Sequence, residues 1–146
     1  MNERGLKPPG GDPAPTSVVL DQGERLDLVT LASEICQRYR QEFPDEERRY
    51  GDAGNAWCVH DNQYLLYWAA EAVNGVLEMT DEVAWLAGVL EARSFPLDRL
   101  ARGLDIGADV VSQVADTHAS RQLVDVLLAS AVFVRSRNSF LDSSWP

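Results

Sequence analysis

The fold is decided by residues 52–74, which read DAGNAWCVHDNQYLLYWAAEAVN. Apolar and aromatic side chains recur there at spacings of three and four residues, which is typical of a helix with a buried face. The run His60-Asp61-Asn62-Gln63 interrupts this pattern with one polar turn. Four successive positions, at about 100° each, cover most of a helix circumference. At least one of these side chains must therefore face protein, either in a structural hydrogen-bond network or in a binding site.

Helical spacing continues along the rest of the chain. Together with 52–74, we predict helices over residues 25–43, 80–93, 96–104, 108–117 and 120–134. The charged residues 45–49 indicate a loop, and Gly107 indicates a break. No stretch shows the two-residue alternation that is typical of a half-buried strand. The sequence predicts an all-α fold, a compact bundle of five to six helices.

Composition divides the chain into three parts. Residues 1–16 hold four of the seven prolines and three of the ten glycines, so we predict a flexible, disordered arm there. Residues 17–135 are predicted to be a single helical domain, large enough to bury about two-thirds of its unfolded surface. Residues 136–146 are predicted to be a C-terminal tail.

The chain is strongly acidic, with 23 acidic and 13 basic residues and a net charge of −10. An acidic protein repels phosphate backbones and anionic membranes, so we expect neither nucleic acid nor a membrane as a partner. No apolar stretch reaches the ~20 residues of a membrane span, and no apolar signal core begins the sequence. Lys7 is the single lysine among the basic residues, a bias typical of high-GC bacterial coding. We therefore expect a bacterial, cytoplasmic protein.

Cys36 and Cys58 are the two cysteines of the chain. Both fall in apolar helical stretches, and two cysteines cannot form a disulfide framework, so we predict buried free thiols in a reducing compartment. A zinc site that combined them with His60 and His118 would have suitable ligand types. However, Cys58 and His60 lie about 200° apart on a helix and cannot converge on one ion. We predict no metal site.

The polar turn supplies the candidate binding site, because the helix face of Asp61 is also the most aromatic face. The predicted ligand-binding residues are Trp57, His60, Asp61, Tyr64 and Trp68. A carboxylate among aromatic rings has a raised pKa unless an arginine or a ring donor holds it ionised. We expect Asp61 to be partly buried and paired. The alternative is a buried hydrogen-bond network that fixes the register of the helix.

Residues 97–116 read LDRLARGLDIGADVVSQVAD. A small residue at Ala101 and apolar residues around it match the packing positions of two short helices joined by a turn. The segment resembles a DNA-binding helix-turn-helix, which implies a DNA-binding regulator. Asp105 replaces the usual turn glycine, and the would-be recognition helix carries Asp109 and Asp116 without a lysine or arginine. Such a surface repels phosphates.

The last predicted helix is apolar on almost every side. Helices of this kind lie at the centre of a bundle or lose their exposed side in a dimer. We therefore predict an interface through Val124, Leu128 and Phe133, with a homodimer as one form of it.

Catalytic and cofactor-binding motifs are missing: no glycine-rich phosphate loop, dinucleotide fingerprint or nucleophile elbow is present. We expect no catalytic residues and no cofactor. The leading interpretation is a non-enzymatic protein–protein interaction protein: a regulator, adaptor or inhibitor-like partner with an acidic surface. The alternative is a helical ligand-binding or sensor domain that uses an aromatic pocket around Asp61, and the DNA-binding regulator is the weakest interpretation. A cavity of several hundred Å³ that touches Asp61 and Trp68 would favour the ligand-binding domain, whereas a filled core would favour the interaction protein.

Overall fold

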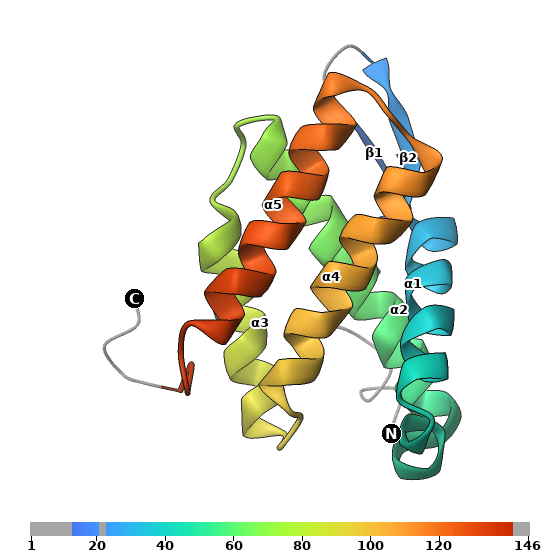
Figure 1. The fold of residues 1–146 in the computed structure, drawn as a ribbon, viewed down its shortest axis with the longest axis vertical. Helices are drawn as coiled ribbons and strands as arrows, with labels where there is room; N and C mark the ends of the chain where they lie inside the picture. The colour runs from blue at the N-terminus through green and yellow to red at the C-terminus, as the bar shows by residue number, and fades with distance from the viewer. Residues whose placement is uncertain (1–12, 21–22, 142–146) are drawn as a thin grey trace.

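A computed structural model describes residues 13–20 and 23–141 of the chain. Its helices are α1 (Leu28–Glu42), α2 (Asp45–Val73), α3 (Met79–Ala92), α4 (Leu97–Val114) and α5 (His118–Arg135). An antiparallel hairpin of β1 (Ser17–Val19) and β2 (Arg25–Asp27) precedes them (Figure 1). The predicted helical bundle is confirmed in its main features. The predicted arm and tail lie largely outside the described residues, and the domain boundaries stay predictions.

The short hairpin is a feature that the predicted all-α fold did not include. Val18 pairs with Leu26 in register, and both side chains are buried. Strands of three residues are too short to show a convincing alternation in the sequence. The hairpin also moves the start of the first helix from Arg25 to Leu28. There the Asp27 side chain caps the helix by accepting a hydrogen bond from the Thr30 amide at 3.1 Å.

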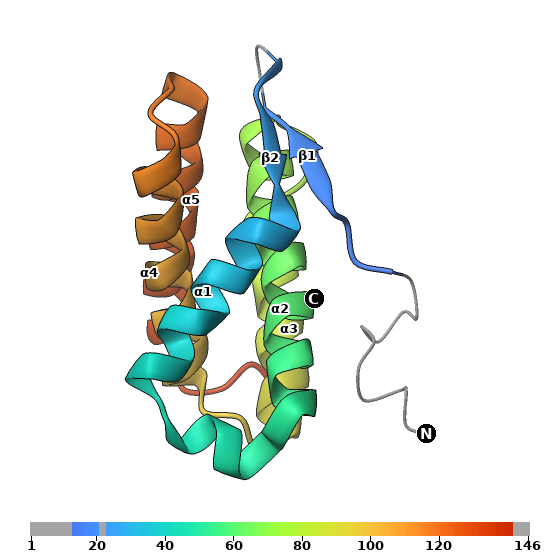
Figure 2. The same cartoon turned by 90° about the vertical axis from the view of Figure 1, so that its right-hand side faces the viewer.

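The five helices lie in two groups that α1 connects. In Figure 2, α4 and α5 lie on one side of the molecule, α2 and α3 lie on the other, and α1 crosses obliquely in front of both. The buried apolar side chains of all five helices and of the hairpin form one continuous core. The end of α1, the start of α2 and the start of α4 meet at the lower end of this bundle.

The predicted charged loop at residues 45–49 is wrong, because these residues are the first turns of α2. Three acidic side chains in the first turn suit the positive end of the helix dipole. The helix bends at Gly51, whose φ of 63° and ψ of −152° are outside the helical region and favour glycine. At the far end Gly75 has a φ of 82°, as a glycine that follows a helix commonly does.

The predicted turn within residues 97–116 is also wrong, because residues 97–114 form the single continuous helix α4. Gly107 does not break this helix. A Cβ at that position would lie 3.4 Å from Ile35 and 3.9 Å from Leu127, so the glycine marks where α1 and α5 pack closely against α4. The helix-turn-helix prediction loses its geometric basis.

The last helix, α5, is buried along one stripe and exposed along another. Leu123, Leu127 and Ala131 are fully buried, whereas Leu128 and Val132 are 43% and 66% exposed. A capping box between Thr117 and Ser120 fixes its start. No helix within the described ranges is both long and apolar enough to cross a membrane.

Candidate ligand-binding site

A cavity of about 260 Å³ opens at the lower end of the bundle. It lies between α1, the N-terminal half of α2, the end of α3 and the start of α4. Its walls are mostly apolar and aromatic, with a few ionisable side chains. The lining residues are Ile35, Tyr39, Glu46, Tyr50, Ala53, Gly54, Trp57, Cys58, Asp61, Asn62, Leu65, Leu90, Arg93, Phe95, Arg99, Leu100 and Gly103.

Helix α2 supplies the longest wall because one of its stripes faces the cavity. Its lining residues, from Tyr50 to Leu65, recur at steps of three and four positions. The bend at Gly51 brings Tyr50 against Gly54, where any Cβ would collide with the Tyr50 side chain. A glycine at position 54 is therefore required for this wall.

Aromatic rings surround the cavity. The rings of Tyr50 and Phe95 lie 6.4 Å apart, centroid to centroid. The Arg93 guanidinium stacks over the Trp57 ring, 4.5 Å from its centroid, which is a cation–π contact. An apolar ring or chain of a ligand would find matching surfaces here.

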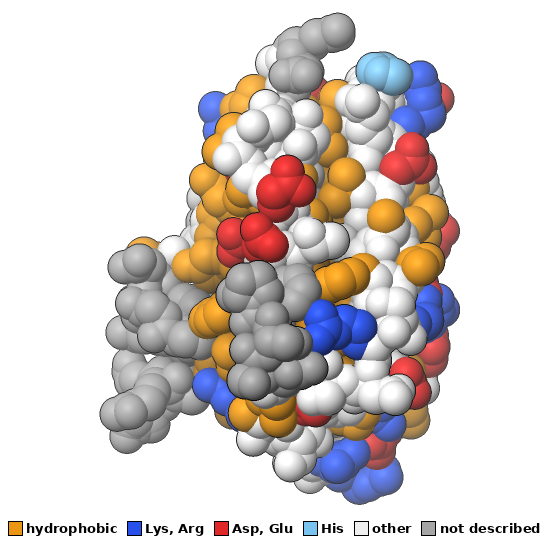
Figure 3. Space-filling view, turned by 90° about the vertical axis from the view of Figure 1, so that its left-hand side faces the viewer, with side chains coloured by type: hydrophobic (Ala, Val, Ile, Leu, Met, Phe, Trp, Pro, Cys, Tyr) orange, Lys and Arg blue, Asp and Glu red, His pale blue; other side chains and the backbone are white. Residues whose placement is uncertain are grey.

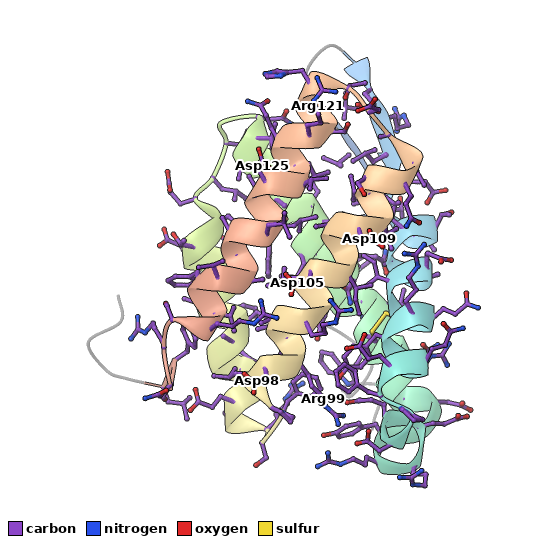
Figure 4. All side chains as sticks on the ribbon, viewed as in Figure 1. Asp98, Arg99, Asp105, Asp109, Arg121 and Asp125 are labelled. Carbon is purple, nitrogen blue, oxygen red and sulfur yellow. A yellow bond between two sulfur atoms is a disulfide. The ribbon has the colours of Figure 1, made fainter. Side chains whose placement is uncertain are left out.

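One polar cluster of the lining is satisfied by its own members. The Tyr39 hydroxyl donates to Glu46 at 2.7 Å, and Arg99 donates to Glu46 at 2.7 Å and to both oxygens of Asp45 at 3.1 Å. Burial, followed by the bond to Glu46, raises the pKa of the Tyr39 hydroxyl, so it stays protonated. The hydrogen bond from Arg99 holds the pKa of the Asp45 carboxyl below its ordinary value. This cluster joins α1, α2 and α4, and Figure 4 shows Arg99 at the start of α4.

Asp61 differs from that cluster. Among the described residues, its side chain makes no hydrogen bond and no ion pair, so the predicted pairing is wrong. Burial raises the pKa of Asp61 to about 7, and the charge of Arg93 opposes this rise. The side chain keeps some accessible surface because the cavity is open beside it. The site therefore holds a carboxyl group that is close to half-ionised at neutral pH.

Two of the other polar-turn residues, Asn62 and Gln63, make structural hydrogen bonds. The Asn62 amide donates to the Cys58 carbonyl oxygen at 2.9 Å, and the buried Gln63 amide donates to the Pro15 carbonyl oxygen at 2.9 Å. The segment before β1 is thus bound to α2. The polar turn therefore holds hydrogen bonds at Asn62 and Gln63, whereas Asp61 lines the cavity.

The prediction of free thiols is wrong, because Cys36 and Cys58 form a disulfide between α1 and α2 (Figure 4). Cys36 lies on the buried stripe of α1, and Cys58 lies on the stripe of α2 that faces it, with their Cα atoms 6.0 Å apart. Spacing within each helix does not reveal that these two faces meet. A cytoplasmic location stays a prediction, and it no longer has support from free thiols.

Of the five predicted ligand-binding residues, Trp57 and Asp61 line the cavity and the other three do not. His60, Tyr64 and Trp68 continue from Trp57 as a row of rings along α2, with centroid separations of 6.4, 6.1 and 5.6 Å between neighbours. The Trp68 ring meets that of Trp85 on α3 edge-on, 6.4 Å away. These three residues flank the stripe that faces the cavity.

Sequence reasoning missed much of the lining. Tyr50 could have been found by extending the stripe of α2 backwards, had the first turns not been predicted as a loop. Arg93 and Phe95 come from the connection between α3 and α4, where Ser94 has a φ of 64°. No periodicity marks side chains of such a connection, so no signal indicated them.

The three predicted interface residues separate in the structure. Val124 and Phe133 pack against the core, and the Phe133 ring meets that of Phe140 at 5.5 Å. Leu128 remains exposed. On the side of the molecule that Figure 3 shows, hydrophobic side chains reach the surface in several separate places among polar ones.

Within the described part of the chain, no group of three or more His, Cys, Asp or Glu side chains could hold a metal ion. No protein family model, curated protein or solved structure matches this chain. The cavity and its chemistry therefore provide the evidence on function.

Proposed function

We propose that this protein binds a small, largely apolar ligand in the cavity beside Asp61. The observation that carries the proposal is the carboxyl group without a protein partner. A buried polar group without a partner costs roughly 1–3 kcal/mol, and a carboxyl group kept for stability is normally paired. Tyr39, Glu46, Arg99 and Asn62 all have partners in this lining. Asp61 is the group that a ligand would complete.

The size and walls of the cavity support the same function. Its volume of about 260 Å³ is slightly below the range of typical ligand pockets, about 300–1,000 Å³, and suits a small ligand. At about 30 Å³ per molecule of liquid water, it has room for roughly nine waters. A fragment with one ring and a short chain is of comparable size.

Gly103 provides the test. It lines the cavity, and a Cβ at this position would meet no heavy atom within 4 Å. The substitution Gly103→Leu should fill the cavity. Gly103→Ala is the matched control, because it takes up little of the cavity volume. Replacing a glycine inside a helix by alanine stabilises the helix by roughly 0.5–1 kcal/mol, so the control should remain folded.

We expect a fragment such as 2-phenylethanol to quench or shift the tryptophan fluorescence of the wild type and of Gly103→Ala, and not of Gly103→Leu. Equal binding by all three proteins would place the fragment elsewhere and contradict the proposal. Thermal unfolding of each variant checks that it remains folded.

The interaction-protein interpretation has one observation in its favour. Leu128 and Val132 are large apolar side chains that are 43% and 66% exposed on α5. Exposed apolar side chains are common singly, and contiguous patches indicate partners. We propose that a second copy of the chain covers Leu128 and Val132.

A further inference from the structure

We infer that the ligand of the cavity is an arylalkyl amine, whose ammonium group pairs with Asp61 and whose ring lies among Tyr50, Trp57 and Phe95. The inference rests on the proposed function and adds the chemical class of the ligand. It stands on the geometry of the lining, in which the Asp61 carboxyl group lies among aromatic rings and has no hydrogen bond or ion pair to a described residue.

Of the acidic groups that line the cavity, Asp61 is the one without a hydrogen bond or an ion pair to a described residue. Tyr39 of α1, Glu46 of α2 and Arg99 of α4 bind one another. Arg93, at the end of α3, is the remaining cation of the lining, and it stacks on Trp57 without an ion pair to Asp61. His60, next to Asp61 on α2, lies between the rings of Trp57 and Tyr64.

A cation is the ligand group that this arrangement stabilises best. An ammonium group offers up to three donors to a carboxylate, and a charge-assisted hydrogen bond is about twice as strong as a neutral one. A carboxylate ligand would be repelled by the ionised Asp61. A protein of net charge −10 also attracts cations from solution at long range.

Aromatic walls favour a ring as the apolar part of the amine. Trp57 already holds the Arg93 guanidinium on its face, and Tyr50 holds that of Arg49 at 5.7 Å. Cations are therefore stabilised by the same rings that line the cavity. A ligand ring can pack edge-to-face or offset against the remaining ring surfaces.

Binding of the amine should be coupled to a proton. Because the pKa of Asp61 is about 7, the free site is largely protonated at pH 5 and largely ionised at pH 8. The affinity for the amine should fall by about 100-fold from pH 8 to pH 5, since the ionised fraction falls roughly tenfold per pH unit below the pKa. A proton should be released on binding at pH 6.

The experiment compares three matched fragments by calorimetry on the full chain: 2-phenylethylamine, 2-phenylethanol and 3-phenylpropanoate. At pH 8 we expect the amine to bind at least about tenfold more tightly than the alcohol, and the carboxylate not to bind. In Asp61→Asn the preference for the amine should disappear while the alcohol still binds. Retained alcohol binding shows that the variant is folded.

The outcomes separate the two proposals. If the alcohol binds the wild type as tightly as the amine does, or if affinity for the amine is the same at pH 5 and pH 8, the amine inference is wrong and the cavity remains a binding site. If the wild type binds the amine more tightly than the alcohol but Asp61→Asn binds the amine equally tightly, another acceptor holds the amine and the inference fails. If none of the fragments binds the wild type, the proposed function itself fails.

Discussion

Asp61 is the residue on which the functional account depends. The sequence placed it correctly on an aromatic face and predicted that it would be partly buried. It could not show that the side chain would lack a partner, because the arginine expected to pair with it comes from another helix. In the structure Arg99 pairs with Asp45 and Glu46 instead, and Arg93 stacks on Trp57.

The open carboxyl group predicts a pH-dependent cost to stability. The folded-state pKa of about 7 lies above the unfolded value of 3.8, so the folded state binds the proton more tightly. The stability contributed by Asp61 is therefore present below pH 4 and is lost as the pH rises towards 7. At about 1.4 kcal/mol per pKa unit, the loss has an upper limit of about 4 kcal/mol.

Asp61→Asn removes this titration. We expect the variant to gain stability relative to the wild type between pH 5 and pH 8, as measured by urea unfolding at both values. The comparison between the two proteins cancels the other titrating groups. A stability difference that does not change with pH would mean that Asp61 is solvated in the folded protein.

Arg99 is a second single residue whose structural role can be tested. Its removal leaves the buried Glu46 without its cation, and breaking such a pair costs about 3 kcal/mol. We expect Arg99→Ala to lower the free energy of unfolding by this amount. The control is Arg102→Ala, which removes an exposed ion pair of the same helix. The side chains of Arg102 and Glu42 are 43% and 40% exposed, so the free energy of unfolding should fall by no more than about 1 kcal/mol. Equal losses for both variants would contradict the structural role of the cluster.

Among the helices, periodicity predicted most of α1, α3 and α5, and it predicted α2 from residue 52 onwards. It failed where a tertiary contact overrides a local signal. Residues 45–49 look like a loop, yet Glu46 is neutralised by Arg99 and the segment is helical. Gly107 looks like a break, yet it packs against Ile35 and Leu127 within one helix.

The disulfide between α1 and α2 predicts a measurable contribution to stability. Cys36 and Cys58 are 22 positions apart, and closing a loop of that length stabilises by about 3 kcal/mol through the entropy of the unfolded chain. We expect a dithiol reductant, or the double variant Cys36→Ser/Cys58→Ser, to lower the urea midpoint accordingly. Thiol titration of the unreduced, denatured protein should find no free thiol. Two free thiols in that sample would contradict the disulfide.

Helix α5 offers a matched pair of neighbouring leucines. Leu127 is 1% exposed and Leu128 is 43% exposed. Leu127→Ala should cost about 2–5 kcal/mol because it opens a cavity in the core. Leu128→Ala should change stability by less than about 0.5 kcal/mol in a monomer. If Leu128 lies at an interface between two copies, Leu128→Glu should shift the sedimentation coefficient towards that of a monomer, whereas an unchanged coefficient would rule out the proposed dimer.

At the scale of the whole molecule, the sequence predicted a helical bundle but not where its helices meet. The cavity forms where these helices meet, since α1, α2, α4 and the connection after α3 all contribute lining residues. Two of its residues, Trp57 and Asp61, were predicted from one helix alone. Arg93 and Phe95 come from a connection without periodicity, and the other lining residues come from helix faces whose meeting no spacing along the chain reveals, so only the three-dimensional arrangement identifies them.

In the structure Asp61 is a poorly solvated carboxyl group at the wall of a cavity, without a hydrogen bond or ion pair to a described residue. A carbon-13 NMR titration of its carboxyl resonance in the wild-type protein measures its pKa, with Asp61→Asn to assign the signal. We expect a pKa of about 7. A pKa at or below the ordinary value of 3.8 would contradict it, because the group would then be exposed to water or held by a cation.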